Sequence, residues 1–150
     1  MHLVYAIDRL GSGGAQRQVV ELALQLAKTE GVRVSLLSYP GANFYADRLQ
    51  DSDVALVRIP KRGRFDAGFP LRLRRWFDEN RADVVHAFIL GPILFGYAAW
   101  RSLPAARRPA FVPAERNVLA GVPRSQLLIK RWIYRRSEAV TVNSHAAADE

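Results

Sequence analysis

Short apolar segments alternate along this chain with longer amphipathic ones, and this alternation most constrains the fold. Residues 3–7 form a continuous apolar run, as expected of a strand that is buried on both faces. Residues 15–28 follow with apolar side chains at helical spacing from Val19 to Leu26. Strands that alternate with helices predict βαβ units with right-handed crossovers. We therefore expect an α/β fold with a mostly parallel sheet covered on both faces, in three layers.

The same alternation continues to the end of the chain. Further strands are predicted at residues 32–38, 54–59, 82–88, 111–114 and 139–142. Further helices are predicted at residues 69–77, 93–101 and 125–136. Asn143 or Ser144 is placed to cap one more helix, yet the sequence stops at Glu150. We therefore expect residues 1–150 to be one domain that is cut near its end from a longer protein.

Composition sets outer limits on the class of protein. A chain of 150 residues that is 49% hydrophobic is long and apolar enough to fold as a single domain with its own core. It contains no cysteine, which excludes disulfides, thiolate metal sites and a cysteine nucleophile. The first residues lack the basic segment of a signal peptide, and no apolar stretch is long enough to span a bilayer. We expect a cytoplasmic protein.

The charge balance predicts an anionic partner. The chain has 22 Lys and Arg against 14 Asp and Glu, a net charge of +8. Two predicted helices combine basic side chains with tryptophan, as helices at an anionic membrane surface do. The candidates for membrane contact are Arg72, Arg75, Lys130, Arg131 and Trp132. No helix-turn-helix, zinc-finger or RRM signature is present, so we do not expect nucleic acid as the partner. Solvated charge over a core-facing stripe is the alternative.

A glycine-rich turn separates the first strand from the first helix. Gly11, Gly13 and Gly14 lie where glycine permits a positive φ and a close approach of the backbone to a ligand. The free N–H groups at the start of the helix then favour an anion such as phosphate. The dinucleotide-binding and Walker A patterns are both unmet, since residue 16 is Gln and no Gly-Lys-Ser/Thr follows. A tight turn without a ligand remains the alternative.

Two further groups lie at predicted strand ends, where open α/β sheets bind ligands. His86 is expected at the carboxyl end of its strand, where imidazole would bind a hydroxyl or phosphate or transfer a proton. Glu115, Arg116 and Asn117 offer an acceptor, a forked donor and an amide, which suit carbohydrate recognition. A histidine satisfied by backbone groups and a loop ion pair are the alternatives. The three histidines lack metal-ligand spacing, so no metal site is predicted.

Taken in order, these segments resemble the N-terminal domain of family 4 glycosyltransferases. The run from Gly13 to Arg17, GGAQR, is similar to the family's G-G-A-E/Q-R segment. The run DVVHA at residues 83–87 resembles the D-V-V-H-x-H strand, with Phe88 in place of the second histidine. The run ERN at residues 115–117 is similar to an S-E-R-N turn of the family. The run RRSEAVTVNS at residues 135–144 resembles an R-A-D-x-V-x-x-x-S segment.

The resemblance implies one half of a GT-B fold, in which two Rossmann-like domains face a cleft. It implies that this chain is the mainly acceptor-binding half and that the nucleotide-sugar domain is not present in it. The Gly13–Gly14 loop would approach either the diphosphate of a UDP- or GDP-linked donor or the acceptor, and His86 would act catalytically near the transferred sugar. Arg17, Glu115, Arg116 and Asn117 would contact substrate.

The implied reaction is sugar transfer, with retention, to a hydroxyl of a lipid-linked or polysaccharide acceptor. No cofactor or metal is implied, and the enzyme would work at the inner face of the membrane in polysaccharide biosynthesis. Two other classes stay open. One is a dinucleotide-binding oxidoreductase domain, although Ser38–Gly41 lacks the acidic residue that binds ribose there. The other is a non-catalytic basic module that binds anionic lipid or nucleic acid.

Overall fold

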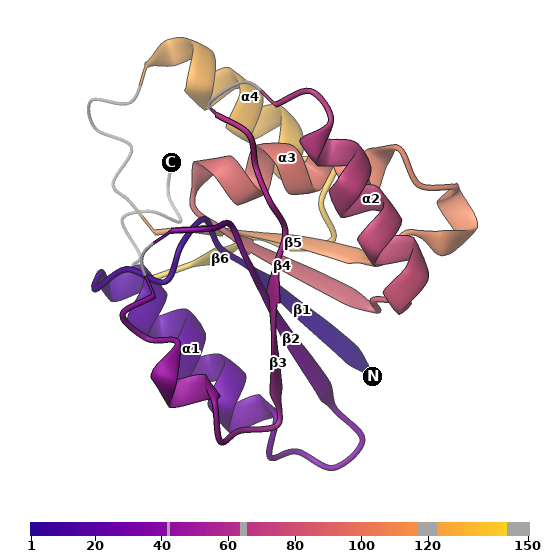
Figure 1. Cartoon of the computed structure of the whole chain (residues 1–150). Helices are drawn as coiled ribbons and strands as arrows, with labels where there is room; N and C mark the ends of the chain where they lie inside the picture. The colour runs from indigo at the N-terminus through magenta and orange to yellow at the C-terminus, as the bar shows by residue number, and fades with distance from the viewer. Residues whose placement is uncertain (42, 64–65, 117–122, 144–150) are drawn as a thin grey trace.

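The computed structural model of this chain describes residues 1–41, 43–63, 66–116 and 123–143. Six strands form one sheet in the order β3-β2-β1-β4-β5-β6, and all of their pairings are parallel (Figure 1). The strands are β1 (His2–Ala6), β2 (Arg33–Ser38), β3 (Val54–Arg58), β4 (Val84–Phe88), β5 (Ala110–Glu115) and β6 (Thr141–Val142). The helices are α1 (Gly14–Leu26), α2 (Phe69–Asn80), α3 (Leu90–Arg101) and α4 (Arg124–Tyr134), with short 3-10 turns at Asp47–Leu49 and Ala105–Arg107. The predicted α/β class is confirmed.

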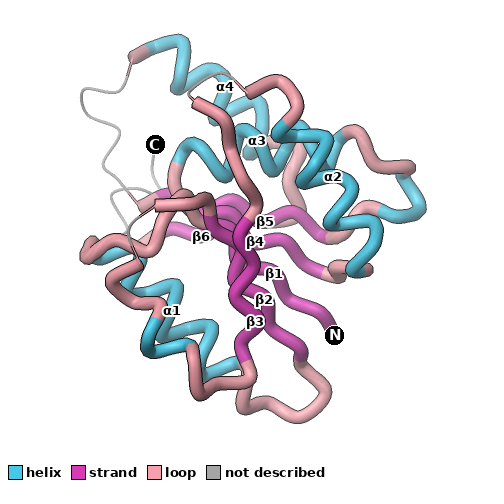
Figure 2. The backbone as a smooth tube through the Cα atoms, viewed as in Figure 1, coloured by secondary structure: helices cyan, strands magenta, loops and turns pink. Residues whose placement is uncertain are grey.

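The helices form two layers, one on each side of the sheet. Helix α1 covers one face, while α2, α3 and α4 lie on the other (Figure 2). Successive residues of a strand point to opposite faces, so Val4 packs in the core beneath α2 and α3 and Tyr5 packs in the core beneath α1. Burial on both faces explains why the strand sequences are mostly apolar rather than alternating. None of the described helices combines the length and apolarity that crossing a bilayer requires.

Several element boundaries differ from the prediction by a few residues, and two of them lie at the carboxyl edge of the sheet. Helix α3 begins at Leu90 rather than near residue 93, so Gly91 and Pro92 lie in its first turn. Proline is tolerated there because the N–H groups of a first turn have no partner within the helix. Strand β5 continues to Glu115, which was predicted to lie beyond the strand. This extension decides which face of the sheet Glu115 points to.

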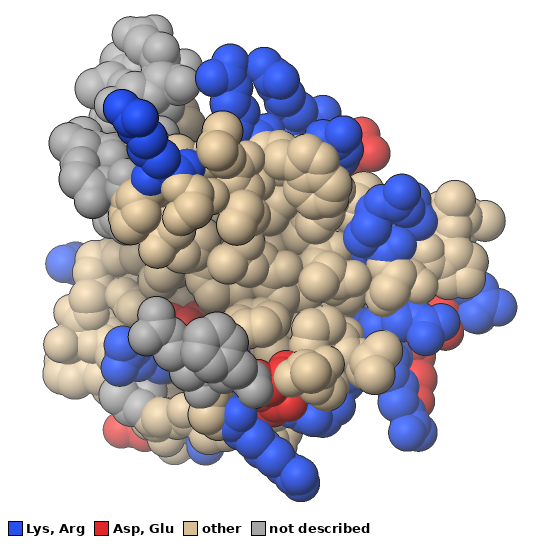
Figure 3. All heavy atoms as spheres, turned by 90° about the horizontal axis from the view of Figure 1, so that it is seen from above, with Lys and Arg blue, Asp and Glu red and all other residues tan. Residues whose placement is uncertain are grey.

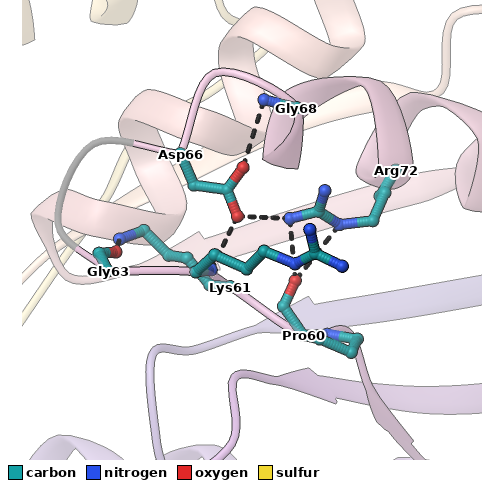
Figure 4. A network of polar contacts seen from close by, with 7 residues as sticks. Pro60, Lys61, Gly63, Asp66, Gly68 and Arg72 are labelled. Atoms are coloured by element: carbon teal, nitrogen blue, oxygen red, sulfur yellow. Dashed lines mark hydrogen bonds and ion pairs between the residues drawn. The ribbon is translucent and has the colours of Figure 1, made fainter.

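The loop from β3 to α2 is organised around one carboxylate (Figure 4). Asp66 accepts hydrogen bonds from the backbone N–H groups of Arg62 at 2.6 Å and Gly68 at 3.1 Å, and it pairs with Arg72. The Arg62 N–H and the Arg72 guanidinium lower the pKa of Asp66. Arg72 also donates to the Pro60 carbonyl at 2.9 Å. Arg72, a predicted membrane contact, is therefore part of the internal bonding of this loop.

Candidate functional site

The carboxyl ends of all six strands lie along one edge of the sheet, where the candidate site was predicted. Strands β1 and β4 are neighbours in the centre of the sheet. The chain leaves β1 for α1 on one face and leaves β4 for α3 on the other (Figure 1). In open α/β sheets the loops separate at such a point, and ligands bind in the crevice between them. The glycine-rich turn after β1 forms one side of this point.

The N-terminus of α1 has no cap from a side chain. Gly13 is the N-cap residue, and the first turn contains no acidic residue. The first backbone hydrogen bond of the helix runs from the Arg17 N–H to the Gly13 carbonyl at 3.0 Å. Ser12, Gly13 and Gly14 are exposed. The helix therefore presents free N–H groups and the positive end of its dipole to solvent at the carboxyl edge, where an anion would be stabilised.

The glycines of this turn do not serve the backbone conformation that we expected. Positive φ values among described glycines occur at Gly31, Gly41 and Gly63, and not in the glycine-rich turn. A Cβ atom added at Gly14 would meet no heavy atom within 4 Å, while one added at Gly13 would contact only the end of the flexible Gln16 side chain. The turn therefore tolerates side chains sterically, and the bare backbone leaves room for a ligand to approach.

Arg116 contacts helix α1 one turn beyond its N-terminus. It follows β5, and its Nη1 donates to Gln18 Oε1 in the second turn of α1 at 3.0 Å. Its guanidinium carbon lies 5.0 Å from the centre of the Phe88 ring, and its Nε is buried without a hydrogen-bond partner in the described part of the chain. Within that same part, no carboxylate forms an ion pair with it. Burial lowers the pKa of Arg116, which nevertheless stays a cation.

His86 does not lie at the carboxyl end of its strand, where it was predicted. It is in the middle of β4, where it pairs in register with Tyr5 and Val112, and Phe88 occupies the end of the strand. The expected position at the carboxyl end is therefore corrected. The imidazole Nε2 is 2.9 Å from Thr141 Oγ1, and the ring centre is 4.3 Å from that of Phe88. Burial, and then the charge of Arg116, lowers the pKa of His86 to about 4. The imidazole is neutral at pH 7.

Glu115 faces away from this site. Adjacent strand residues point to opposite faces, so Arg116 turns toward α1 while Glu115 turns toward α4. The Glu115 carboxylate is buried, pairs with Lys130, and accepts a hydrogen bond from the Tyr134 hydroxyl at 2.8 Å. Burial and the Glu115 carboxylate raise the pKa of that hydroxyl. The prediction of Glu115 beside Arg116 in a substrate site is therefore corrected by the position of its carboxylate.

The other predicted residues divide between the two faces. Arg17 is exposed on the first turns of α1, close in sequence to Gly13 and Gly14, and Asn117 lies outside the described residues. Lys130 was predicted at the membrane surface, but it is only 7% exposed because it neutralises buried Glu115. Arg75 pairs with Glu79 at 2.7 Å. Arg131 and Trp132 are exposed on α4.

Sequence reasoning missed the residues that support the predicted ones. Gln18 orients Arg116, and Thr141 binds His86, although neither stands out in the sequence. Tyr134 lies four positions after Lys130, so it shares a helix face with that lysine. That spacing was the available signal for the group around Glu115.

A shallow hollow at the opposite, amino edge of the sheet is lined by Met1, His2, Gly31, Val32, Arg33, Arg81 and Asp83.

The sequence profile of Glycosyltransferase Family 4 matches residues 12–150, which is nearly the whole chain. The chain belongs to this family. This family 4 domain has the fold of solved glycosyltransferases. It is 15% identical to Anabaena HepE in complex with UDP, with a TM-score of 0.78 over 99% of this chain. It is 19% identical to a glycosyltransferase from Rickettsia africae, with a TM-score of 0.72 over 99% of this chain.

The domain spans about two fifths of those proteins, covering 39% of the HepE chain and 38% of the Rickettsia chain. Its architecture matches the N-terminal half of GT-B glycosyltransferases, so the predicted fold is confirmed. It also resembles a short-chain dehydrogenase/reductase from Veillonella parvula in complex with NADP, at 12% identity and a TM-score of 0.56. That likeness concerns the fold alone. A search of curated proteins finds no match.

Proposed function

We propose that this family 4 domain is the acceptor-side half of a retaining glycosyltransferase, and that it works with a second domain that binds a UDP- or GDP-linked sugar. The observation that carries the proposal is the uncapped start of α1 next to Arg116, at the point where β1 and β4 diverge. Departure of a nucleoside diphosphate builds negative charge, and fixed N–H donors and a cation stabilise such charge in the transition state. The UDP bound to HepE, a protein of the same fold, supports this reading.

We assign different tasks to the residues on the α1 face. The N–H groups around Gly13 and Gly14, with Arg116, would bind the diphosphate, and Arg17 would attract the anionic substrate from the exposed side of α1. His86 contacts Phe88 and Thr141, through which it would act as a positioning residue. Its neutral imidazole packs against the Phe88 ring, and the Arg116 guanidinium lies over that same ring.

The acceptor would be a hydroxyl of a lipid-linked or polysaccharide glycan, and the enzyme would act in polysaccharide biosynthesis on the cytoplasmic side of a membrane. Excess positive charge on the domain supports an acceptor that carries phosphate or lies among anionic lipids. The first test is transfer of labelled sugar from UDP- and GDP-linked donors. We expect none from residues 1–150 alone and activity when the second domain is in the same polypeptide. Tight NAD binding by calorimetry would instead favour the oxidoreductase class.

Gly14→Asp separates the stability of α1 from its proposed role. An acidic side chain in the first turn of a helix favours the helix dipole, so we expect the free energy of unfolding to rise by about 0.3–1 kcal/mol. The same carboxylate would repel a diphosphate, so we expect kcat/KM for transfer to fall about tenfold or more. Urea unfolding and transfer assays of the two-domain enzyme measure the two effects. Unchanged transfer by the Gly14→Asp enzyme would contradict the site.

Arg116→Gln tests the cation. We expect inhibition by UDP to weaken about tenfold, since a charge-assisted hydrogen bond to the diphosphate is lost. Arg107→Gln is the matched control, because Arg107 is exposed and pairs with Asp78 away from the crevice. Competition assays on the two-domain enzyme compare the variants. Equal inhibition of both variants by UDP would remove Arg116 from the site.

A further inference from the structure

The outward face of α4 is apolar, which is the reverse of an ordinary surface helix. Leu128 is 68% exposed, and Ile129 and Trp132 are each 47% exposed. These side chains follow one another along the helix at spacings that bring them to the same side. Exposed apolar residues occur singly on most soluble proteins, whereas a group on one helix face marks an interaction surface.

Arginines surround these apolar side chains. Arg124, Arg131, Arg135 and Arg136 are exposed on and just after α4. No described carboxylate forms an ion pair with any of them. The Arg136 guanidinium lies 4.5 Å from the centre of the Trp132 ring. Seen from above, blue side chains surround a tan centre and outnumber the red ones (Figure 3). The helix thus combines uncovered apolar area with unneutralised positive charge.

The inward face of α4 is already complete without these residues. Ile133 is in the core, and Lys130 and Tyr134 both bind the Glu115 carboxylate. The edge of Trp132 rests on Tyr97 of α3, with ring centres 5.2 Å apart. These contacts hold the helix in place, and the exposed Leu128 and Ile129 side chains are not needed for them. The outward face of α4 is therefore exposed although the inward face of the same helix is fully packed against the domain.

We propose that the outward face of α4, defined by Leu128, Ile129, Trp132, Arg131 and Arg135, docks on an anionic lipid bilayer. Leucine, isoleucine and tryptophan enter the boundary between headgroups and acyl chains, while arginines bind the anionic headgroups. A nucleic acid would use the arginines but would leave the exposed Leu128 and Ile129 without partners. Two copies of the chain would bring these uncompensated arginines together, which is repulsive.

Helix α4 is favoured over α2, the other basic helix of the sequence prediction. Arg72 and Arg75 on α2 are engaged by Asp66 and Glu79, so less of their charge is available to lipid. Helix α4 also lies at the carboxyl edge of the sheet, because Glu115 at the end of β5 binds it. Docking through α4 would therefore bring the candidate crevice close to the membrane surface. Lipid binding itself needs neither a sugar donor nor a second domain.

Sedimentation with lipid vesicles tests the proposal on the 150-residue chain. We expect binding to an equal mixture of phosphatidylglycerol and phosphatidylcholine, and little binding to phosphatidylcholine alone. Leu128→Gln combined with Trp132→Gln should weaken binding about tenfold or more, because apolar area no longer enters the bilayer. Arg131→Gln and Arg135→Gln should each weaken it about fivefold. Phe44→Gln is the matched control, since Phe44 is 67% exposed on a loop far along the chain from α4, and its binding should equal that of wild type.

Fluorescence gives a second readout that does not depend on folding of the glutamine variants. Vesicles with brominated acyl chains should quench part of the tryptophan emission of the wild-type chain, and Trp132→Phe should bind equally while losing that quenching. The proposal is overturned if the α4 variants bind like the Phe44→Gln control, if no anionic vesicle binds, or if quenching persists in Trp132→Phe. It is also overturned if the chain is a dimer that the Leu128→Gln/Trp132→Gln variant dissociates. These tests use no sugar donor, so a failure of the proposed transferase function would not change their outcome.

Discussion

Lys130→Met is expected to lower the free energy of unfolding by about 3–5 kcal/mol, the range found when one partner of a buried ion pair is removed. The substitution leaves the Glu115 carboxylate inside the protein, where the Tyr134 hydroxyl and the Arg116 N–H are neutral donors to it. Those donors cannot replace the full charge of the ammonium group. Urea unfolding monitored by circular dichroism measures the loss.

The double variant Glu115→Gln/Lys130→Met separates charge from packing. A neutral glutamine can still accept from Tyr134, and methionine fills much of the space of lysine, so most of the lost stability should return. Arg131→Met is the matched control, because Arg131 is next in sequence and exposed, and its stability should lie within about 0.5 kcal/mol of wild type. If Lys130→Met behaves like Arg131→Met, the pair is not buried in solution.

Acid is expected to destabilise the domain through His86. The unfolded chain takes up this proton near pH 6.5, whereas the folded chain keeps the imidazole neutral down to about pH 4. The unfolded state therefore binds more protons between these values, so the contribution of His86 is present above pH 6.5 and is lost as the pH falls toward 4. The difference in pKa corresponds to about 3 kcal/mol. Burial also lowers the pKa of His2, which acts in the same direction.

Unfolding free energies of wild type and His86→Asn between pH 4 and 8 test this contribution. The variant should lose most of the slope and keep the part that comes from His2. Nuclear magnetic resonance of the His86 ring gives the pKa directly, and Arg116→Gln should raise it, because the Arg116 charge is one of its two causes. An unchanged slope in His86→Asn, or a His86 pKa near 6.5, would show that the ring is open to water.

The sheet and its helices were predictable because their signals are local. Val19 and Leu26 repeat at helical spacing, and the run beginning at Leu3 is apolar throughout, so each element carries its own period. The direction of a side chain at a strand end is not local. Glu115 and Arg116 are neighbours in sequence, yet Glu115 faces α4 and Arg116 faces α1. The reason is that β5 extends to Glu115, one residue beyond its last apolar residue.

The same limit explains the error at α4. Sequence places Lys130 among basic surface residues, since lysine is rarely buried alone. Its burial depends on Glu115, which is fifteen residues earlier and on another element. For His86 the strand and its end at Phe88 were predicted, but His86 was assigned to that end although it lies in the middle of β4. Long-range partners, rather than periodicity, decide the burial of Lys130 and the contact of His86 with Thr141.

The central place of β1 affects how the chain assembles during synthesis. Its neighbour β4 pairs through contacts such as the hydrogen bond from the His2 N–H to Asp83, which joins residues 81 positions apart. Until the ribosome has released β4, one side of β1 is an open row of N–H and C=O groups between apolar faces, a state that recruits other strands. A nascent chain that contains only β1, α1, β2 and β3 is therefore the species on which chaperones would act.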